Sequence, residues 1–361
     1  MNVLITTVVM VFAATIFVLD NNEATATQPA ETMGSGGLKN EDAESRNAQH
    51  LIQNQLSKYQ KAYPEIDFRL LSSSEEYAQL LPLEDVLGAG VTNLDYQHPE
   101  ELRTTLVEAQ EYRIGLMVEN EMSSATLFHT PMEKTNGKQY TCLITIAPSL
   151  LGNTSSHVAS EYFYDLSRKT IESMPTALRF NHQDVLLYTL NHELFHCIDA
   201  YLSGFIYAQT EDSVKASYDR RKAEIRADIF ASISHLSRKP SDHRFLANLA
   251  LARTIQLLHG DTEHYSSDVL NLIENDYQPP RESDIEFLVN SALTLFEAST
   301  ISYEEHKELL TAMYVINQRF GIATTETSDN TPMAGEKPDP ERVTALTDTI
   351  SNAIKIVRGN Q

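Results

Sequence analysis

The chain has 361 residues, of which 42% are hydrophobic, and a chain of this kind can bury a large core in one or two domains. Its 50 acidic residues outnumber the 28 basic ones, which gives a formal net charge of -22. Proteins that bind nucleic acid gather lysine and arginine against the phosphate backbone, whereas the densest basic cluster here is the short run Arg220–Lys222. The composition therefore predicts a globular protein and argues against a nucleic-acid partner.

An uncharged apolar run covers residues 3–19, and Ala24, Thr25 and Ala26 behind it match the small-residue pattern of a signal-peptidase site. This predicts a signal peptide over residues 1–26 and a secreted protein in an extracellular or periplasmic space. Because no lysine or arginine precedes the run, an uncleaved N-terminal anchor is the alternative. No later segment is long and apolar enough to span a bilayer, so stable membrane insertion is not expected after cleavage.

The segments up to residue 152 mix helical and strand-like patterns. Residues 27–40 are small, polar and glycine-rich, which is typical of a flexible leader. We expect a polar helix over 40–63 and a short helix over 99–110. Alternation and β-branched or aromatic residues predict strands over 67–73, 112–119, 124–130 and 139–147. Few of these strands are separated by full crossover helices, so residues 41–152 are predicted to form an α+β part with an antiparallel or mixed sheet.

From residue 153 onward the pattern changes to long helical periods. Helices are expected over 156–174, 183–204, 214–236, 242–260, 284–299 and 303–320. Residues 153–320 are therefore predicted to be mainly helical. Residues 321–361 begin with a linker rich in proline, threonine and acidic residues and end with a predicted helix over 342–357 that packs loosely or binds a partner.

The segment LYTLNHELFHCIDAYL, residues 187–202, places two histidines and a glutamate in an otherwise apolar run. Positions i and i+4 share one face of a helix, so His192 and His196 can bind the same metal ion. Glu193 lies one position further round, where a carboxylate can take a proton from a metal-activated water. This is the HExxH pattern, and its alternative interpretation is two ordinary histidines on a partly polar helix face.

A third ligand is expected, because catalytic zinc usually has three protein ligands and one open position. Glu224 and Asp228 are again spaced i and i+4, on a later helix with apolar neighbours. We expect Glu224 to complete a His-His-Glu site for one Zn²⁺, and Asp228 to accept the free ring N–H of His192. The alternative is that both acids are solvated beside neighbouring arginines, although the apolar neighbours argue against a fully exposed face.

The HExxH motif followed by E-x-x-A-D on a later helix resembles the gluzincin clan of zinc metallopeptidases, typified by thermolysin-like enzymes. The likeness is confined to the segment from Asn191 to Ser232, and within the clan HELFHCID and YDRRKAEIRADIF look similar to lethal-factor-type toxin peptidases. A metzincin site is disfavoured, because Asp199 and Leu202 stand where its pattern requires glycine and histidine. The resemblance implies a zincin-like fold.

The resemblance also implies roles for individual residues. His192, His196 and Glu224 match the zinc ligands, and Glu193 matches the general base. Asp228 matches the partner that orients a zinc-binding histidine, and Asp199 is expected to orient a neighbouring side chain.

A donor that stabilises the reaction's oxyanion is also expected. Tyr218 is the first candidate, although it precedes Glu224 by six positions where seven are typical of lethal-factor-like enzymes. His264 and Tyr265, in a turn between helices, are the second candidates, and a plain helix-capping loop is the alternative interpretation of this turn.

The chain has two cysteines, Cys142 and Cys197, which permit one disulfide in an oxidising compartment or two buried free thiols. The strand over 139–147 fits the edge strand that pairs with an extended peptide in such enzymes, although a core strand has the same pattern. If the disulfide forms, it ties this strand to the helix of His196.

These features together predict a secreted zinc-dependent metalloendopeptidase that acts on a protein or peptide substrate. One alternative is a zinc amidohydrolase acting on a cell-wall or small amide substrate, because the same site can activate water toward another amide. Another is a non-catalytic binding or toxin-associated module with a zincin-like fold.

Overall fold

The computed structural model describes residues 38–71, 123–129, 140–152, 155–203, 212–277, 284–299, 301–320 and 338–359. The predicted signal peptide, the predicted helix over 99–110, the predicted strand over 112–119 and most of the predicted linker lie outside these residues. Residues 38–40 of the expected leader already belong to the first described helix, α2 (Leu38–Ala62). None of the helices within these residues has an apolar stretch long enough to cross a bilayer.

The sheet contains three described strands, β1 (Ile66–Leu71), β2 (Ser124–His129) and β3 (Tyr140–Thr145), in the order β1-β3-β2. Strand β3 pairs with β1 in parallel and with β2 in antiparallel orientation, so the sheet is mixed, as expected. The prediction of 139–147 as an edge strand is wrong, because β3 is hydrogen-bonded on both sides. Its consecutive residues Thr141–Thr145 are all buried, which is typical of a central strand covered on both faces.

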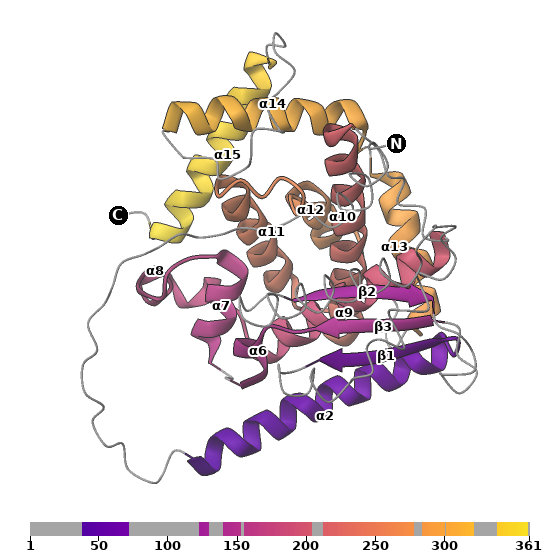
Figure 1. Cartoon of the computed structure of the whole chain (residues 1–361). Coiled ribbons are helices and arrows are strands. Elements are labelled where there is room, and N and C mark those ends of the chain that lie inside the picture. The colour runs from indigo at the N-terminus through magenta and orange to yellow at the C-terminus, as the bar shows by residue number, and fades with distance from the viewer. Residues whose placement is uncertain are drawn as a thin grey trace, which may run out of the picture.

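Helix α2 lies along the sheet beside β1 and also contacts the central helix α9 (His182–Ser203) (Figure 1). Ile52, Leu56 and Tyr59 form its buried stripe, with the spacing of one helix face. Gln55 Nε2 and the Tyr59 hydroxyl both donate to Asn191 Oδ1, at 2.6 and 2.8 Å. The N-terminal helix therefore fixes the residue that directly precedes His192.

The predicted helix over 156–174 is in fact two helices, α7 (Ser156–Tyr164) and α8 (Arg168–Ser173), which follow the short α6 (Pro148–Gly152). Asp165 ends α7 with φ 49°, in the left-handed region. A residue in this conformation cannot continue an α-helix, and aspartate adopts it more readily than most residues. A single 3-10 turn, Thr176–Leu178, then leads to α9.

Helix α9 packs face to face against α10 (Ser213–Arg238), and these two helices form the centre of the molecule. Nearly every side chain of α9 from Asp184 to Ala200 is buried, as expected for a helix surrounded by other elements. Around α10 lie α11 (His243–Leu258), α12 (Ser267–Asp276), α13 (Ile285–Ala298) and α14 (Tyr303–Phe320). Of these helices, only α12 was absent from the sequence predictions.

The C-terminal helix α15 (Pro340–Arg358) crosses α14 and reaches α11 (Figure 1). The expectation that it packs loosely is wrong. Val343, Leu346, Ile350, Ala353 and Val357 are buried at intervals of three or four positions, so one complete face of the helix is covered.

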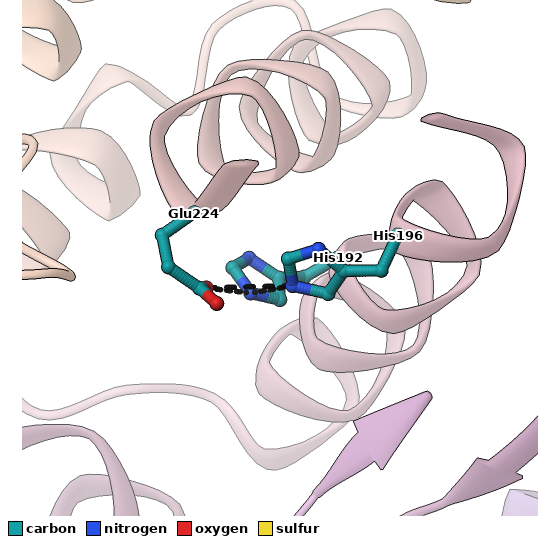
Figure 2. Close-up of side chains that lie close together, drawn as sticks. All are labelled: His192, His196 and Glu224. Carbon is teal, nitrogen blue, oxygen red and sulfur yellow. Dashed lines mark hydrogen bonds and ion pairs between the residues drawn. The ribbon is translucent and has the colours of Figure 1, made fainter. Parts of the chain in front are cut away.

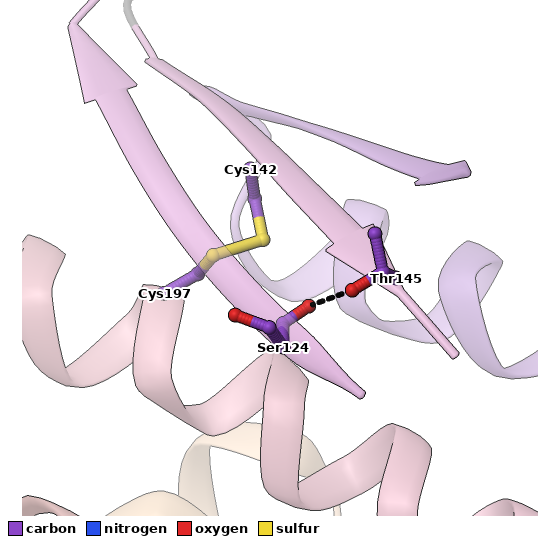
Figure 3. Close-up of a disulfide and its surroundings, with 4 residues drawn as sticks. All are labelled: Ser124, Cys142, Thr145 and Cys197. Carbon is purple, nitrogen blue, oxygen red and sulfur yellow. Dashed lines mark hydrogen bonds between the residues drawn. A yellow bond between two sulfur atoms is a disulfide. The ribbon is translucent and has the colours of Figure 1, made fainter. Parts of the chain in front are cut away.

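A disulfide joins Cys142 of β3 to Cys197 of α9, with a Cα–Cα distance of 6.0 Å (Figure 3). This decides between the two states that the sequence left open. Both cysteines are buried, and β3 is tied on its other side to β2, where the Thr145 hydroxyl donates to the Ser124 carbonyl. The disulfide therefore fastens the sheet to α9 at the residue directly after His196.

Replacing both cysteines by alanine should lower the free energy of unfolding by about 3 to 4 kcal/mol. The disulfide closes a long loop, with a sequence separation of 55, and a cross-link of this kind restricts the unfolded chain strongly. Urea denaturation of the metal-free oxidised protein and of the Cys142→Ala/Cys197→Ala variant measures the difference. A loss below about 1 kcal/mol would show that the cross-link contributes little.

Candidate metal centre

Three side chains from α9 and α10 meet at one point in the core (Figure 2). His192 Nε2 lies 3.0 Å from Glu224 Oε2 and 3.1 Å from His196 Nε2. His196 Nε2 lies 3.4 Å from the same Glu224 oxygen. Within the described residues this is the one group of three or more potential ligands whose atoms all lie close enough to hold a metal ion. The structure therefore brings together the three ligands that the sequence predicts.

The distances among these atoms fit a tetrahedral ion. Ligands about 2.0 to 2.1 Å from such an ion are separated from one another by about 3.3 Å. The three observed separations are close to this value, so the atoms can occupy three corners of a tetrahedron with small adjustments. Two imidazoles and one carboxylate are also the ligand types of a common class of catalytic zinc sites.

Asp228 contacts the opposite nitrogen of His192 and is fully buried. Its Oδ1 lies 2.9 Å from His192 Nδ1, so a proton on Nδ1 leaves the Nε2 lone pair for a metal. Arg253 of α11 donates to both carboxylate oxygens, at 2.6 and 2.9 Å. The hydroxyls of Tyr188 and Ser266 also donate to it, at 2.8 and 2.6 Å. The expected partner of His192 is thus itself held by three other side chains.

The protonation of this group follows from its contacts. Burial alone would raise the pKa of Asp228, but the Arg253 guanidinium and His192 hold it well below its usual range. Burial likewise opposes ionisation of Glu224, yet the charges of His264 and His196 keep its pKa low. Burial would lower the pKa of His192, but its contacts with Asp228 and Glu224 raise the pKa to about 9. In the metal-free centre these contacts favour the charged forms of Asp228, Glu224 and His192.

Glu193 is also buried, with 7% of its surface exposed. Burial raises the pKa of its carboxyl, although the nearby charges of His192 and His196 lower it in part. A carboxylate with a raised pKa accepts and returns a proton near neutral pH more readily than an ordinary glutamate. The environment of Glu193 therefore suits the expected general base.

Of the three candidates for oxyanion stabilisation, only His264 reaches the centre. Its Nε2 lies 3.0 Å from Glu224 Oε2, and its ring stacks at 6.3 Å from that of His192. Its Nδ1 lies 2.9 Å from Asp261, which fixes the orientation of the ring. His264 is not among the three residues that could hold a metal ion, so it lies beside the centre and is not one of its candidate ligands.

The structure does not bring the two tyrosine candidates to the centre. The Tyr218 hydroxyl donates to the Ile301 carbonyl at 3.2 Å, on the side of α10 that faces α14. The ring of Tyr265 is buried in a separate cluster with α14 and α15. Six positions on a helix rotate a side chain by about 240°, so Tyr218 and Glu224 point in different directions.

Asp199 orients a neighbouring side chain, as the sequence suggested. It accepts hydrogen bonds from Arg226 Nε and Nη2, at 3.1 and 2.6 Å. Both residues are largely buried, and the pair links α9 to α10 one turn beyond His196. Asp199 therefore contributes to the packing of α9 against α10.

The structure brings to the centre four further residues that the sequence did not lead us to expect. Arg253 occurs in the apolar helix α11, and an arginine in such a helix is a signal that a buried acid accompanies it. Asp261 precedes His264 by three positions, and aspartate is favoured in turns because its side chain can accept from a backbone N–H a few residues on, as it does here. Tyr188 and Ser266 carry no comparable signal, because nothing in the chain indicates that they face Asp228.

Comparison of the chain with protein-family models, with curated proteins and with solved structures finds no match. The assignment of function therefore depends on the site itself.

Zinc binding at pH 7 should release about one proton. His192 of the metal-free protein has a pKa of about 9, so its protonated form dominates below this pH and competes with the metal. The apparent zinc affinity should therefore rise between pH 7 and 8.5, by up to about tenfold per unit. Calorimetric titration in buffers of different ionisation enthalpy counts the protons. An affinity that stays constant over this range would contradict the assignment of His192 as a ligand.

Asp228→Asn should lower the free energy of unfolding of the metal-free protein by about 3 kcal/mol. The substitution leaves the buried charge of Arg253 without its counter-charge, which costs far more than breaking a surface pair. Asp219→Asn, on the same helix, is the matched control, because Asp219 pairs with Lys222 near the surface and should cost about 1 kcal/mol or less. Equal losses in urea denaturation would show that the buried pair stabilises the fold no more than the surface pair does.

Proposed function

We propose that this chain is a secreted, zinc-dependent metalloendopeptidase of gluzincin type. The observation that carries the proposal is the convergence of His192 Nε2, His196 Nε2 and Glu224 Oε2 beside a buried glutamate with a raised pKa. A disulfide in the core supports the secreted location, because such bonds persist mainly in oxidising compartments.

In this proposal the chain's own residues orient the reactants and move protons. A zinc ion bound by the three ligands supplies Lewis-acid polarisation of a carbonyl and activation of water. The Glu193 carboxylate takes the proton of the attacking water and delivers it to the leaving amine nitrogen. His264 keeps its two ring nitrogens on Glu224 and Asp261, and its raised pKa gives it a positive charge that would stabilise the nearby oxygen that becomes negative when the carbonyl is attacked.

We place the substrate along β2, in place of the strand that the sequence favoured. Strand β3 has both of its edges occupied, whereas β2 is one of the two outer strands of the described sheet and contacts α9. An extended peptide can add to such a strand through main-chain hydrogen bonds, which hold many sequences in one register.

One experiment separates this function from its two alternatives. Metal analysis of the purified protein is combined with hydrolysis of a diverse peptide library, with and without a chelator. Chelator-sensitive cleavage of peptides supports the peptidase. If zinc is bound and the protein cleaves cell-wall or small amides but no peptides, the amidohydrolase is supported. Bound zinc without any hydrolysis supports a binding module.

Glu193→Gln should lower turnover by at least about 100-fold and leave about one zinc ion per chain. The amide cannot take a proton from water, but it is not one of the three ligands, so the metal stays bound. Glu172→Gln, an exposed glutamate on α8, is the control and should retain full activity. Wild-type rates in Glu193→Gln would remove this residue from the mechanism.

A further inference from the structure

The segment Asp261–Ser266, which joins α11 to α12, lies against α10 and is called the strap below. Four of its residues contact α10. Glu263 pairs with Arg220 at 2.6 Å, and the Tyr265 carbonyl accepts from Arg221 at 3.4 Å. His264 contacts Glu224 at 3.0 Å, and the Ser266 hydroxyl donates to Asp228 at 2.6 Å.

The order of these contacts shows how the strap is aligned. Glu263, His264 and Ser266 meet positions 220, 224 and 228 of α10, each one helical turn after the last. The strap therefore runs along one face of α10, in the direction of the helix. This is the face that carries the third metal ligand and the partner of His192.

The strap is fixed within itself as well as against the helix. It follows Gly260, whose φ of 98° is a conformation that favours glycine. Asp261 accepts a hydrogen bond from the His264 backbone N–H at 3.1 Å and also contacts the His264 ring. The position of His264 is thus set by Asp261 from one side and by the Glu263–Arg220 pair from the other.

We propose that the strap sets the metal-binding geometry of α10, and that Arg220 and Glu263 are positioning residues for this purpose. Their ion pair locks the strap in register, so that His264 holds the carboxylate of Glu224 and Ser266 holds that of Asp228. The inference rests on the metal site of the proposed function, but it does not require that the protein cleave peptides.

The anchoring pair is suited to a test because it is separate from the ligands. The side chains of Arg220 and Glu263 are 39% and 27% exposed, so their replacement leaves the core intact. A partly exposed ion pair contributes up to about a fivefold change in an equilibrium constant, and this sets the expected scale. Loss of a residue that directly holds a ligand has a larger effect, about tenfold or more.

The experiment measures the zinc affinity of the metal-free full chain by competition with a chromophoric chelator. Arg220→Gln and Glu263→Ala should each weaken zinc binding about three- to fivefold, and His264→Ala about tenfold or more. The exchanged pair, Arg220→Glu with Glu263→Arg, should restore affinity to within about twofold of the wild type. Lys215→Gln is the matched control, because Lys215 pairs with Asp219 on the same helix away from the strap, and it should leave the affinity unchanged.

The outcomes separate this inference from the peptidase proposal. Wild-type zinc affinity in both single variants, or no recovery in the exchanged pair, would overturn the role of the strap. A change in unfolding free energy without a change in zinc affinity would also overturn it, since a merely structural contact has that signature. If the wild type binds zinc and the variants weaken it, the strap stands even if no peptide is cleaved. If the wild type binds no zinc, both proposals fall.

Discussion

The structure depends on the packing of α9 against α10, because α9 is surrounded by other elements and still carries polar side chains at its centre. A buried histidine or carboxylate is costly unless a partner satisfies it. His192 and Glu193 are buried, and α10 supplies both Glu224 and Asp228 to the imidazole of His192. The other elements then complete this arrangement: α11 contributes Arg253, the strap contributes Ser266, and α2 covers Asn191.

The core holds two charged groups that differ in how their charges are balanced. Asp228 and Arg253 form a fully compensated pair that keeps its charges at any ordinary pH. The group of His192, His196 and Glu224 is different, because its atoms crowd together and it holds a proton that a cation can displace. A site of this kind can hold a divalent cation, and Glu193, whose buried carboxyl has a raised pKa, lies nearby.

Three sets of contacts hold the two site helices in place, and one of them joins the helices directly. The disulfide ties α9 to the central strand β3, next to His196. The Asp199–Arg226 pair joins the helices one turn further on. The strap covers α10 from the other direction. Catalytic groups have to be held to within a fraction of an ångström, and supports on several sides of a site serve that requirement.

Much of the fold could be predicted because it follows from the local periodicity of apolar residues in the sequence. The long helices, two of the mixed sheet's strands and the position of β3 in the chain followed from spacing alone. The errors arose where geometry depends on a single residue or on a neighbour in space. Asp165 breaks a helix by its left-handed conformation, and α12 is too short for its pattern to stand out. The place of β3 in the sheet depends on which strands pair with it, and strand pairing is not local.

The sequence by itself predicted the three candidate ligands, since the i, i+4 spacing of His192 and His196 and of Glu224 and Asp228 places each pair on one helix face. It also indicated Glu193 as the candidate base, because a carboxylate beside the two imidazoles can take a proton from a metal-activated water. Only the tertiary structure decided which side chains surround these residues, and it places His264, but neither Tyr218 nor Tyr265, beside Glu224. The physical reason is that helical periodicity fixes the direction of a side chain relative to its own helix, whereas contact with a distant segment depends on how the whole chain packs.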